Sequence, residues 1–323
     1  MKFFNLDLHI SVIEDIKYLF KDLGHEVDSW CISGHNWVFN RKPAKPDIIN
    51  QNTWKNIDQS LCDKFYARYN NELSKYDGFI CCYPPAFALL YEKFDKPIFI
   101  VAATRYDYPC SDSKERLEWL NSKLTSMIDS GQIIPIANNK YDKFYCEYFL
   151  DREFTHIPSI CNYTNSYYSG HLDPIVSGRS NIRGLNHILS LGRYSWDKLY
   201  SHRCIIHIPY NVSIMSIFEQ YTANVPMFFP TISLGKNLPG YLSEIFFQTN
   251  IASCEYRALT ENNRLMLSDF YDKEWMPHIE YFDSLEDLSI KIDTCSYNDV
   301  SYRMEQFNKK RLNKILTLWK QIL

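Results

Sequence analysis

The sequence lacks the short motifs that mark several large enzyme classes. It has no G-x-S-x-G, no P-loop and no G-x-G-x-x-G, so hydrolase, NTPase and dinucleotide-binding interpretations have no support. It also has no C-x-x-C pair and no H-x-x-x-H, so we expect no metal site. The ten cysteines are scattered along the chain, which is typical of buried free thiols in a reducing compartment.

Long apolar runs and basic runs are missing as well. No apolar stretch is long enough to span a membrane, and charged residues such as Asp7 and Glu14 interrupt the N-terminal apolar stretch, which argues against a signal peptide. The second of two glycosylation sequons, at Asn211, lies in the predicted site described below, where a glycan has no room. We therefore expect a cytoplasmic protein. The net charge of −3 and the pI near 6.3 give no general attraction to nucleic acid.

Strands and helices are expected to alternate along the first half of the chain. Apolar residues recur with a helical period over 12–23, with Ser11 as the N-cap and Gly24 just past the end. The continuous apolar run at 97–102 is typical of a parallel strand buried on both faces. We expect strands at 2–8, 26–32, 77–82, 97–102, 132–137 and 154–158, and helices at 12–23, 54–75, 84–94, 111–129 and 138–150. This alternation predicts a doubly wound parallel sheet.

The second half is expected to form a domain of its own. A chain of 323 residues, 46% of them hydrophobic, suggests two domains, each with a core. Residues 159–171 break the rhythm and predict the linker, so we expect domains at 1–160 and 161–323. We expect strands at 173–177, 187–191, 204–208, 225–229 and 278–282, and helices at 213–223, 242–247, 262–270, 284–292 and 300–323. The architecture predicted is α/β throughout.

Residues 204–230 are the strongest candidate for a functional segment. Their pattern is an apolar strand, a short loop, a helix and a second strand. Pro209 and Tyr210 end the first strand, and Ser213 is a plausible cap for the helix. A helix N-terminus after a buried parallel strand presents free N–H groups and partial positive charge at the sheet edge where α/β folds bind ligands, which suits a diphosphate.

The same helix carries two further polar candidates. Ser216 lies three residues after Ser213, so both are expected near the helix start, and Glu219 follows on the same face as Ser216. A carboxylate there is placed to accept a hydrogen bond from a ribose or sugar hydroxyl. The alternative is a plain strand-helix-strand unit with capping serines and a solvated Glu219.

The run from Ser213 to Pro230 resembles the donor-site signature of GT-B glycosyltransferases, in which a helix carries serine and then glutamate and a turn leads into an apolar strand. The stretch Leu23-Gly-His-Glu-Val27 is similar to the opening of GT-B N-terminal domains. The resemblance implies two Rossmann-like domains facing a cleft, a C-terminal helix that crosses back to the N-domain, and contact of Glu219 with the nucleotide ribose or sugar.

Departures from the family pattern bear on the mechanism. The retaining branch of GT-B carries two glutamates eight residues apart, but Asn211 and Met227 stand at those distances from Glu219. A linear D-x-D motif, typical of metal-dependent GT-A enzymes, is also absent. We therefore expect a metal-independent, inverting enzyme that needs no cofactor beyond its nucleotide-sugar co-substrate.

An inverting transfer needs a base for the acceptor hydroxyl. Asp7 and His9 stand at the end of the first predicted strand, where such a base is expected. His9 is the first candidate, and Asp7 the second, either as the base itself or as the group that orients the His9 ring. The alternative is that both residues only cap the next helix.

Three further positions are candidates for binding the acceptor. His35 and Trp37 lie in a loop after the second strand, where an aromatic ring can stack on a sugar, and Arg105 follows a buried strand and suits a phosphate or carboxylate. Arg193 is a candidate to neutralise the donor diphosphate in place of a metal. The alternatives are ordinary packing of the loop, an ion pair of Arg105 with Asp107 or another carboxylate, and a surface role for Arg193.

Together these patterns predict a glycosyltransferase, of hexosyltransferase type, that moves a sugar from a nucleotide-sugar to a glycan or other small-molecule acceptor. A GT-B-like sugar-nucleotide epimerase is the alternative within enzymes. A non-catalytic carbohydrate- or nucleotide-binding protein on the same fold is the alternative outside them. A DNA-modifying glucosyltransferase is a further variant, against which the acidic pI argues.

Overall fold

The computed structural model describes residues 1–244 and 265–323, which fall into two units. Unit 1 contains 1–159 and 316–323, and unit 2 contains 160–244 and 265–315. Each unit is built around its own parallel β-sheet with helices. The expected α/β architecture of two Rossmann-like domains is confirmed.

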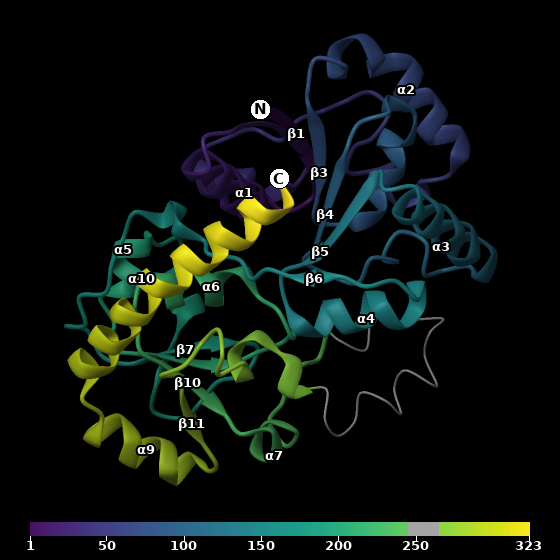
Figure 1. Cartoon of the computed structure of the whole chain (residues 1–323). Helices are drawn as coiled ribbons and strands as arrows, with labels where there is room; N and C mark the ends of the chain where they lie inside the picture. The colour runs from purple at the N-terminus through teal and green to yellow at the C-terminus, as the bar shows by residue number, and fades with distance from the viewer. Residues whose placement is uncertain (245–264) are drawn as a thin grey trace. The chain divides into compact units, whose positions relative to one another are not determined.

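The sheet of unit 1 has six parallel strands in the order β2-β1-β3-β4-β5-β6. Figure 1 labels β1, β3, β4, β5 and β6 of this sheet. Their bounds are β1 Lys2–Asp7, β2 Glu26–Cys31, β3 Gly78–Cys81, β4 Ile98–Ala102, β5 Ile133–Ala137 and β6 Thr155–His156. The apolar run expected to be buried on both faces forms β4, whose five residues are all buried. The doubly wound parallel sheet is therefore confirmed for unit 1.

The helices of unit 1 begin and end close to where the sequence pattern puts them. They are α1 Ile10–Asp22, α2 Gln59–Leu73, α3 Lys114–Asp129 and α4 Lys140–Leu150. The expected helix at 84–94 is instead a 3-10 helix, Pro85–Phe94, and all but two of its residues are buried. The single helix expected at 54–75 is interrupted, because Asp58 accepts the Leu61 N–H and starts a new helix after the short turn Trp54–Asn56.

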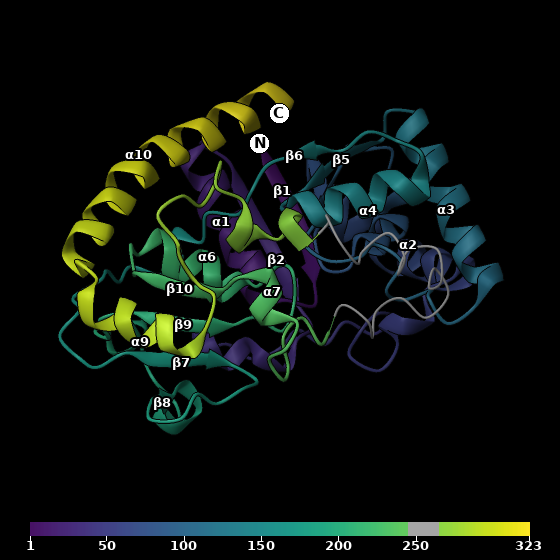
Figure 2. The ribbon, with the colours of Figure 1, turned by 90° about the horizontal axis from the view of Figure 1, so that it is seen from below.

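The sheet of unit 2 has five parallel strands in the order β11-β10-β9-β7-β8. Figure 2 shows β7, β9 and β10 of this sheet. The bounds are β7 Ile175–Gly178, β8 Asn186–His187, β9 Ile205–Ile208, β10 Met227–Pro230 and β11 Glu280–Phe282. Buried residues on one side of the sheet form an apolar cluster that includes Val176, Ile206 and Phe228.

Some predictions for the second half are wrong. The strand expected at 187–191 ends at His187, and a 3-10 turn, Ile188–Leu191, follows. The helices of unit 2 include α5 Trp196–Tyr200, α6 Met215–Thr222, α7 Ile232–Gly235 and α9 Leu285–Thr294, of which α5 and α7 were not predicted. Half of the helix expected at 242–247 and the first three residues of the helix expected at 262–270 lie outside the described residues, and the described part of the second range forms two short 3-10 turns, Leu265–Leu267 and Asp269–Tyr271.

The terminal helix α10, Tyr297–Ile322, contributes to both units. Its last residues belong to unit 1, where Trp319 is 1% exposed. The Trp319 ring packs against Phe20 of α1, with ring centres 5.2 Å apart, and against Phe99 of β4, at 6.4 Å. The prediction that the C-terminal helix returns to the N-terminal domain is confirmed.

Both sheets share a feature that locates candidate sites. In unit 1 the chain places β2 on one side of β1 and then β3 on the other side. In unit 2 it places β8 on one side of β7 and then β9 on the other side. In doubly wound folds, ligands bind outside the carboxyl ends of the strands at this reversal, the switch point. The ends of β1 and β3 and the ends of β7 and β9 are therefore the places to look for function.

Candidate functional site

Asp7 joins the two strand ends at the switch point of unit 1. It is the last residue of β1 and is fully buried. One carboxylate oxygen accepts the His9 backbone N–H at 3.1 Å, and the other accepts the backbone N–H groups of Cys82 and Tyr83, both at 3.0 Å. Cys82 and Tyr83 directly follow β3, so one side chain organises the backbone on both sides of the switch point.

The environment of Asp7 defines its role. Burial raises the pKa of the Asp7 carboxyl to about 7, against the lowering effect of the backbone donors at Tyr83, His9, Cys82 and Leu8. Its hydrogen bonds go to the backbone of His9 and not to the imidazole ring. Asp7 therefore positions His9 through the main chain.

The His9 side chain lies in a buried environment close to the end of β1. Burial, together with the nearby His35, lowers the pKa of His9 to about 4, so the ring is neutral at pH 7. Its Nδ1 is buried and has no hydrogen-bond partner among the described residues. The ring centre lies 5.7 Å from that of Tyr83. A neutral imidazole with an unused ring nitrogen can accept a proton, although burial makes this ring a weaker base than a free imidazole.

His35 and Trp37 lie on the 3-10 helix Gly34–Phe39 that follows β2. The Ser33 hydroxyl caps this helix by accepting the His35 backbone N–H at 3.0 Å. The His35 side chain is exposed, and Trp37 is 49% exposed. Because His35 acts on the pKa of His9, the two histidines lie within electrostatic range of each other.

A row of aromatic side chains extends from His9 along the same edge of the sheet. The Tyr83 ring centre lies 6.3 Å from that of Tyr108, and the Tyr108 ring centre lies 5.3 Å from that of Trp54. Tyr83 and Tyr108 are partly exposed. The sequence carries 24 tyrosines, so nothing local marked these two as candidates.

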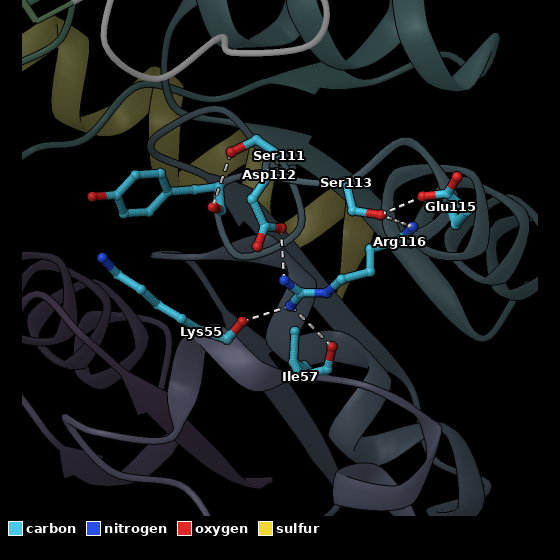
Figure 3. Close-up of polar contacts among 8 residues, drawn as sticks. Lys55, Ile57, Ser111, Asp112, Ser113, Glu115 and Arg116 are labelled. Carbon is cyan, nitrogen blue, oxygen red and sulfur yellow. Dashed lines mark hydrogen bonds and ion pairs between the residues drawn. The ribbon is translucent and has the colours of Figure 1, made fainter.

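Arg116, on α3, fixes the loop that carries Tyr108 (Figure 3). Its guanidinium donates to the Asp112 carboxylate at 2.6 Å and to the Lys55 and Ile57 carbonyl oxygens at 2.5 and 3.5 Å. The loop after β4 is thereby joined to the segment next to Trp54. The hydrogen bonds of Arg116 therefore fix the two segments that carry Tyr108 and Trp54.

Arg105 lies in the interior and not at an open edge. It is 2% exposed, and its Nη1 lies 3.3 Å from an Asp142 carboxylate oxygen. Nearby, burial raises the pKa of Asp107 to about 6, and the Tyr145 hydroxyl donates to that carboxyl at 3.0 Å. A buried ion pair of this kind fixes the end of β4 and presents no charge to an acceptor in solvent. This geometry fits the ion-pair alternative, with Asp142 as the partner.

The switch point of unit 2 brings a cation against an aromatic ring. Gly178 ends β7 with φ of +132°, and a Cβ there would lie 2.1 Å from the Ile208 carbonyl oxygen, so only glycine fits. The next residue, Arg179, lies with its guanidinium 5.1 Å from the centre of the Tyr210 ring and forms an ion pair with Glu244. A cavity of about 240 Å³ lies beside Arg179 and Ile208.

Backbone hydrogen bonds join the loop after β9 to residues 242–244. The carbonyl oxygen of buried Pro209 accepts the Leu242 N–H at 2.7 Å, and that of Tyr210 accepts the Glu244 N–H at 2.9 Å. Burial raises the pKa of the Tyr210 hydroxyl. The two residues predicted to end the strand thus lie at the carboxyl edge of the sheet.

The start of α6 differs from the prediction. Ile214 occupies the N-cap position, and α6 begins at Met215 without a side-chain cap. Ser213 lies one residue before the N-cap, so its predicted capping role is wrong, whereas Ser216 lies in the first turn and is partly buried. The helix start is therefore left without a serine acceptor.

Glu219 lies on α6 and is 8% exposed. One carboxylate oxygen accepts the Tyr163 hydroxyl at 2.5 Å, and the other accepts the Trp196 indole N–H at 3.2 Å. Both oxygens are thus engaged within unit 2. A sugar hydroxyl that bonds to Glu219 has to share the carboxylate with these two donors or displace one of them.

Arg193 and Arg179 differ in their relation to the switch point. Arg193 is exposed and follows the 3-10 turn after the edge strand β8. Arg179 directly follows β7 at the switch point itself, and the sequence interpretation missed it. The pattern Gly178-Arg179-Ser180 after an apolar strand is the signal that marks it.

The described residues lack two features, a cluster of metal-binding side chains and a membrane-spanning helix. Over 1–244 and 265–323, no three His, Cys, Asp or Glu side chains cluster in a way that could hold a metal ion. No helix in this part of the chain combines the length and apolar character needed to cross a bilayer.

Comparisons with known proteins give structural likenesses only. No protein-family model matches the sequence, and no curated protein matches it significantly. The chain is similar to the glycotransferase of kitacinnamycin (11% identity, TM-score 0.46, 100% of this chain and 99% of that one). It is also similar to CalG4, the calicheamicin glycosyltransferase, with 11% identity and a TM-score of 0.37 over 99% of this chain and 97% of that one. A third similar structure is the spinosyn rhamnosyltransferase SpnG complexed with thymidine diphosphate, with 9% identity and a TM-score of 0.42 over 100% of both chains. The fold assignment stands on the strand order of the two sheets.

Proposed function

We propose that this chain is a metal-independent, inverting glycosyltransferase that transfers a sugar from a nucleotide-sugar to a glycan or other small-molecule acceptor. One observation supports the proposal above all: the switch points of the two sheets carry complementary chemistry. That of unit 1 carries the neutral His9 with an unused ring nitrogen, and that of unit 2 carries the Arg179 cation against Tyr210. A base and a diphosphate-binding cation are the two groups such a transfer needs.

The donor is assigned to unit 2. The N-terminal N–H groups of α6 offer partial positive charge to the leaving diphosphate, and so does the Arg179 guanidinium, which the diphosphate has to share with Glu244. The Tyr210 ring supports the Arg179 guanidinium, and Ser216 in the first turn of α6 offers a hydroxyl. Glu219 serves the ribose or sugar through the carboxylate that now accepts from Tyr163.

The acceptor and the base are assigned to unit 1. The neutral His9 ring takes the proton of the acceptor hydroxyl while the acceptor oxygen forms a bond to the anomeric carbon. The bond from that carbon to the diphosphate oxygen breaks on the opposite face, and the diphosphate leaves with the electron pair. His35 and Tyr83 lie near His9, and Trp37 lies on the same 3-10 helix as His35, so these three residues are assigned to polar and aromatic contacts with the acceptor.

Calorimetric titration with UDP and with TDP tests the donor site. We expect the wild-type protein to bind one of these nucleotides, and Arg179→Ala to weaken binding by about tenfold or more, because a charge-assisted contact to the diphosphate is lost. Arg203→Ala is the matched control, since Arg203 is an exposed arginine of unit 2 paired with Asp173. Absence of binding at millimolar nucleotide, or equal losses in both variants, would contradict the assignment.

Turnover of a nucleotide-sugar tests the base. His9→Ala should abolish transfer and leave nucleotide affinity unchanged, because the ring acts on the acceptor proton. Release of an isomerised nucleotide-sugar without any acceptor would instead identify an epimerase. Nucleotide binding with no turnover, unaltered by His9→Ala, would identify a non-catalytic binding protein.

A further inference from the structure

A further cavity lies apart from the residues of the proposed donor site. It has a volume of about 540 Å³ and lies within unit 2, between residues 160–168, the end of α6 and one face of α10. Thr222, the last residue of α6, and Ala223, its C-cap, line the cavity shortly before β10 begins at Met227, so the cavity lies toward the amino end of β10, whereas Arg179 and Tyr210 follow the carboxyl ends of β7 and β9. Its volume is in the range of pockets that hold small ligands.

The walls of this cavity are held by specific contacts. Arg311 is 2% exposed and donates to the Thr222 hydroxyl and the Asn308 side-chain oxygen, both at 3.3 Å. The Asn308 amide N–H₂ donates to the Tyr221 carbonyl oxygen at 2.7 Å and to the Asn224 side-chain oxygen at 2.8 Å. The polar groups of the cavity are therefore ordered by the protein itself, which lowers the entropic cost of binding.

The lining combines amides and hydroxyls with an unusually exposed ring. Asn162, Asn224 and Ser301 contribute polar groups, and Tyr167 lines the cavity although its side chain is 68% exposed. An exposed phenol ring and amide groups in one cavity match the apolar faces and the hydroxyl edges of a pyranose.

The charged side chains that line the cavity are engaged within the protein. Glu305 and Lys309 are lining residues, and their side chains form an ion pair with each other at 2.7 Å. The Glu305 carboxylate repels a phosphate, and Lys309 is already neutralised. Arg311 is buried beneath two aromatic rings, 5.3 Å from the centre of the Tyr221 ring and 5.9 Å from that of Phe218.

We propose that this cavity is a second carbohydrate-binding site, which takes an uncharged oligosaccharide independently of the nucleotide-sugar. The observation that carries the proposal is the exposed Tyr167 ring in the same cavity as the Asn224 amide, which Asn308 holds in place. Binding at this cavity does not require sugar transfer, so a test of it is independent of the proposed function.

An oligosaccharide array followed by calorimetry on the full chain tests this proposal. We expect at least one uncharged oligosaccharide to bind, with UDP and TDP unable to compete. Tyr167→Ala should weaken that binding by about tenfold, because the stacking contact is lost. Tyr302→Ala is the matched control, since Tyr302 is 60% exposed on α10 and does not line the cavity.

Several results would overturn the proposal. They are the absence of binding to any uncharged oligosaccharide at 10 mM, displacement of the oligosaccharide by UDP or TDP, and equal losses in the Tyr167 and Tyr302 variants. Thermal unfolding of both variants verifies that they fold, so that a loss of binding can be assigned to the ring.

Discussion

His9 and Asp7 lie two residues apart but meet different environments. Asp7 accepts backbone N–H groups from the residues that follow β1 and β3, whereas the His9 ring lies next to His35 and Tyr83 and leaves a nitrogen unused. The two side chains therefore have different roles: the Asp7 carboxylate fixes the backbone, and the His9 imidazole keeps a nitrogen available for proton transfer. Spacing in the sequence alone left both residues as candidates for the base.

The protonation of His9 can be measured directly. The pKa of the His9 ring should be about 4, below its ordinary value of 6.5, because burial and His35 disfavour the charged form. The ring's contribution to stability is therefore fully present above pH 6.5 and is lost as the pH falls toward 4, since the unfolded chain binds the proton first. An NMR titration of the ring protons, assigned with His9→Phe, checks this. A midpoint at pH 6 or above would contradict it.

Asp7 can be tested through stability. Asp7→Ala removes the acceptor of three backbone N–H groups and leaves them unsatisfied, so the free energy of unfolding should fall by about 2–3 kcal/mol. Urea unfolding measures the change. Asp22→Ala, at an exposed position on the last turn of α1, is the control and should change stability by less than about 0.5 kcal/mol. Equal effects of the two substitutions would remove the structural role assigned to Asp7.

At the scale of elements, helix starts were harder to predict than helices. Ser11 and Ser213 were predicted as caps, but α1 and α6 begin after His9 and Ile214, neither of which makes a side-chain cap bond. By contrast, the Ser284 hydroxyl accepts the Asp287 N–H at the start of α9. Whether a serine caps a helix depends on the backbone angles of the preceding loop, which the local sequence does not specify.

Two serines of unit 2 therefore make a matched pair. Ser284→Ala should lower the free energy of unfolding by about 1 kcal/mol, because the exposed N–H groups of α9 lose an acceptor. Ser213→Ala should lower it by less than about 0.5 kcal/mol, since Ser213 caps nothing. Chemical denaturation of both variants measures the difference. A larger loss at Ser213 would restore it as a structural cap.

The strands were predictable because apolar runs identify them without reference to the rest of the chain. β4 and β9 differ from their predicted bounds by one residue at an end. The order of strands within a sheet arises from pairings between distant segments, and the sequence alone does not fix it. For that reason His9 was found at the end of its strand, whereas Tyr83 and Arg179, whose importance depends on neighbouring strands, were missed.

At the scale of the whole molecule, unit 1 is discontinuous in sequence. Trp319→Ala should lower the stability of unit 1 by about 3–5 kcal/mol, because a fully buried indole between Phe20 and Phe99 leaves a cavity. Hydrogen exchange in α1 and β4 measures this loss within unit 1. Lys320→Ala is the control at the next, exposed position. Unchanged exchange in both variants would show that the indole adds nothing to this core.

The position of Trp319 also has a consequence for the synthesis of the protein. Residues 1–159 are translated first, but the indole that covers Phe20 and Phe99 comes 160 residues after Ser159. At ribosomal speeds of about 5–20 residues per second, the apolar surface beside Phe20 remains uncovered for ~10–30 seconds. Throughout that time the nascent chain offers a binding surface to molecular chaperones, and the first domain reaches its final stability only after the second has been made.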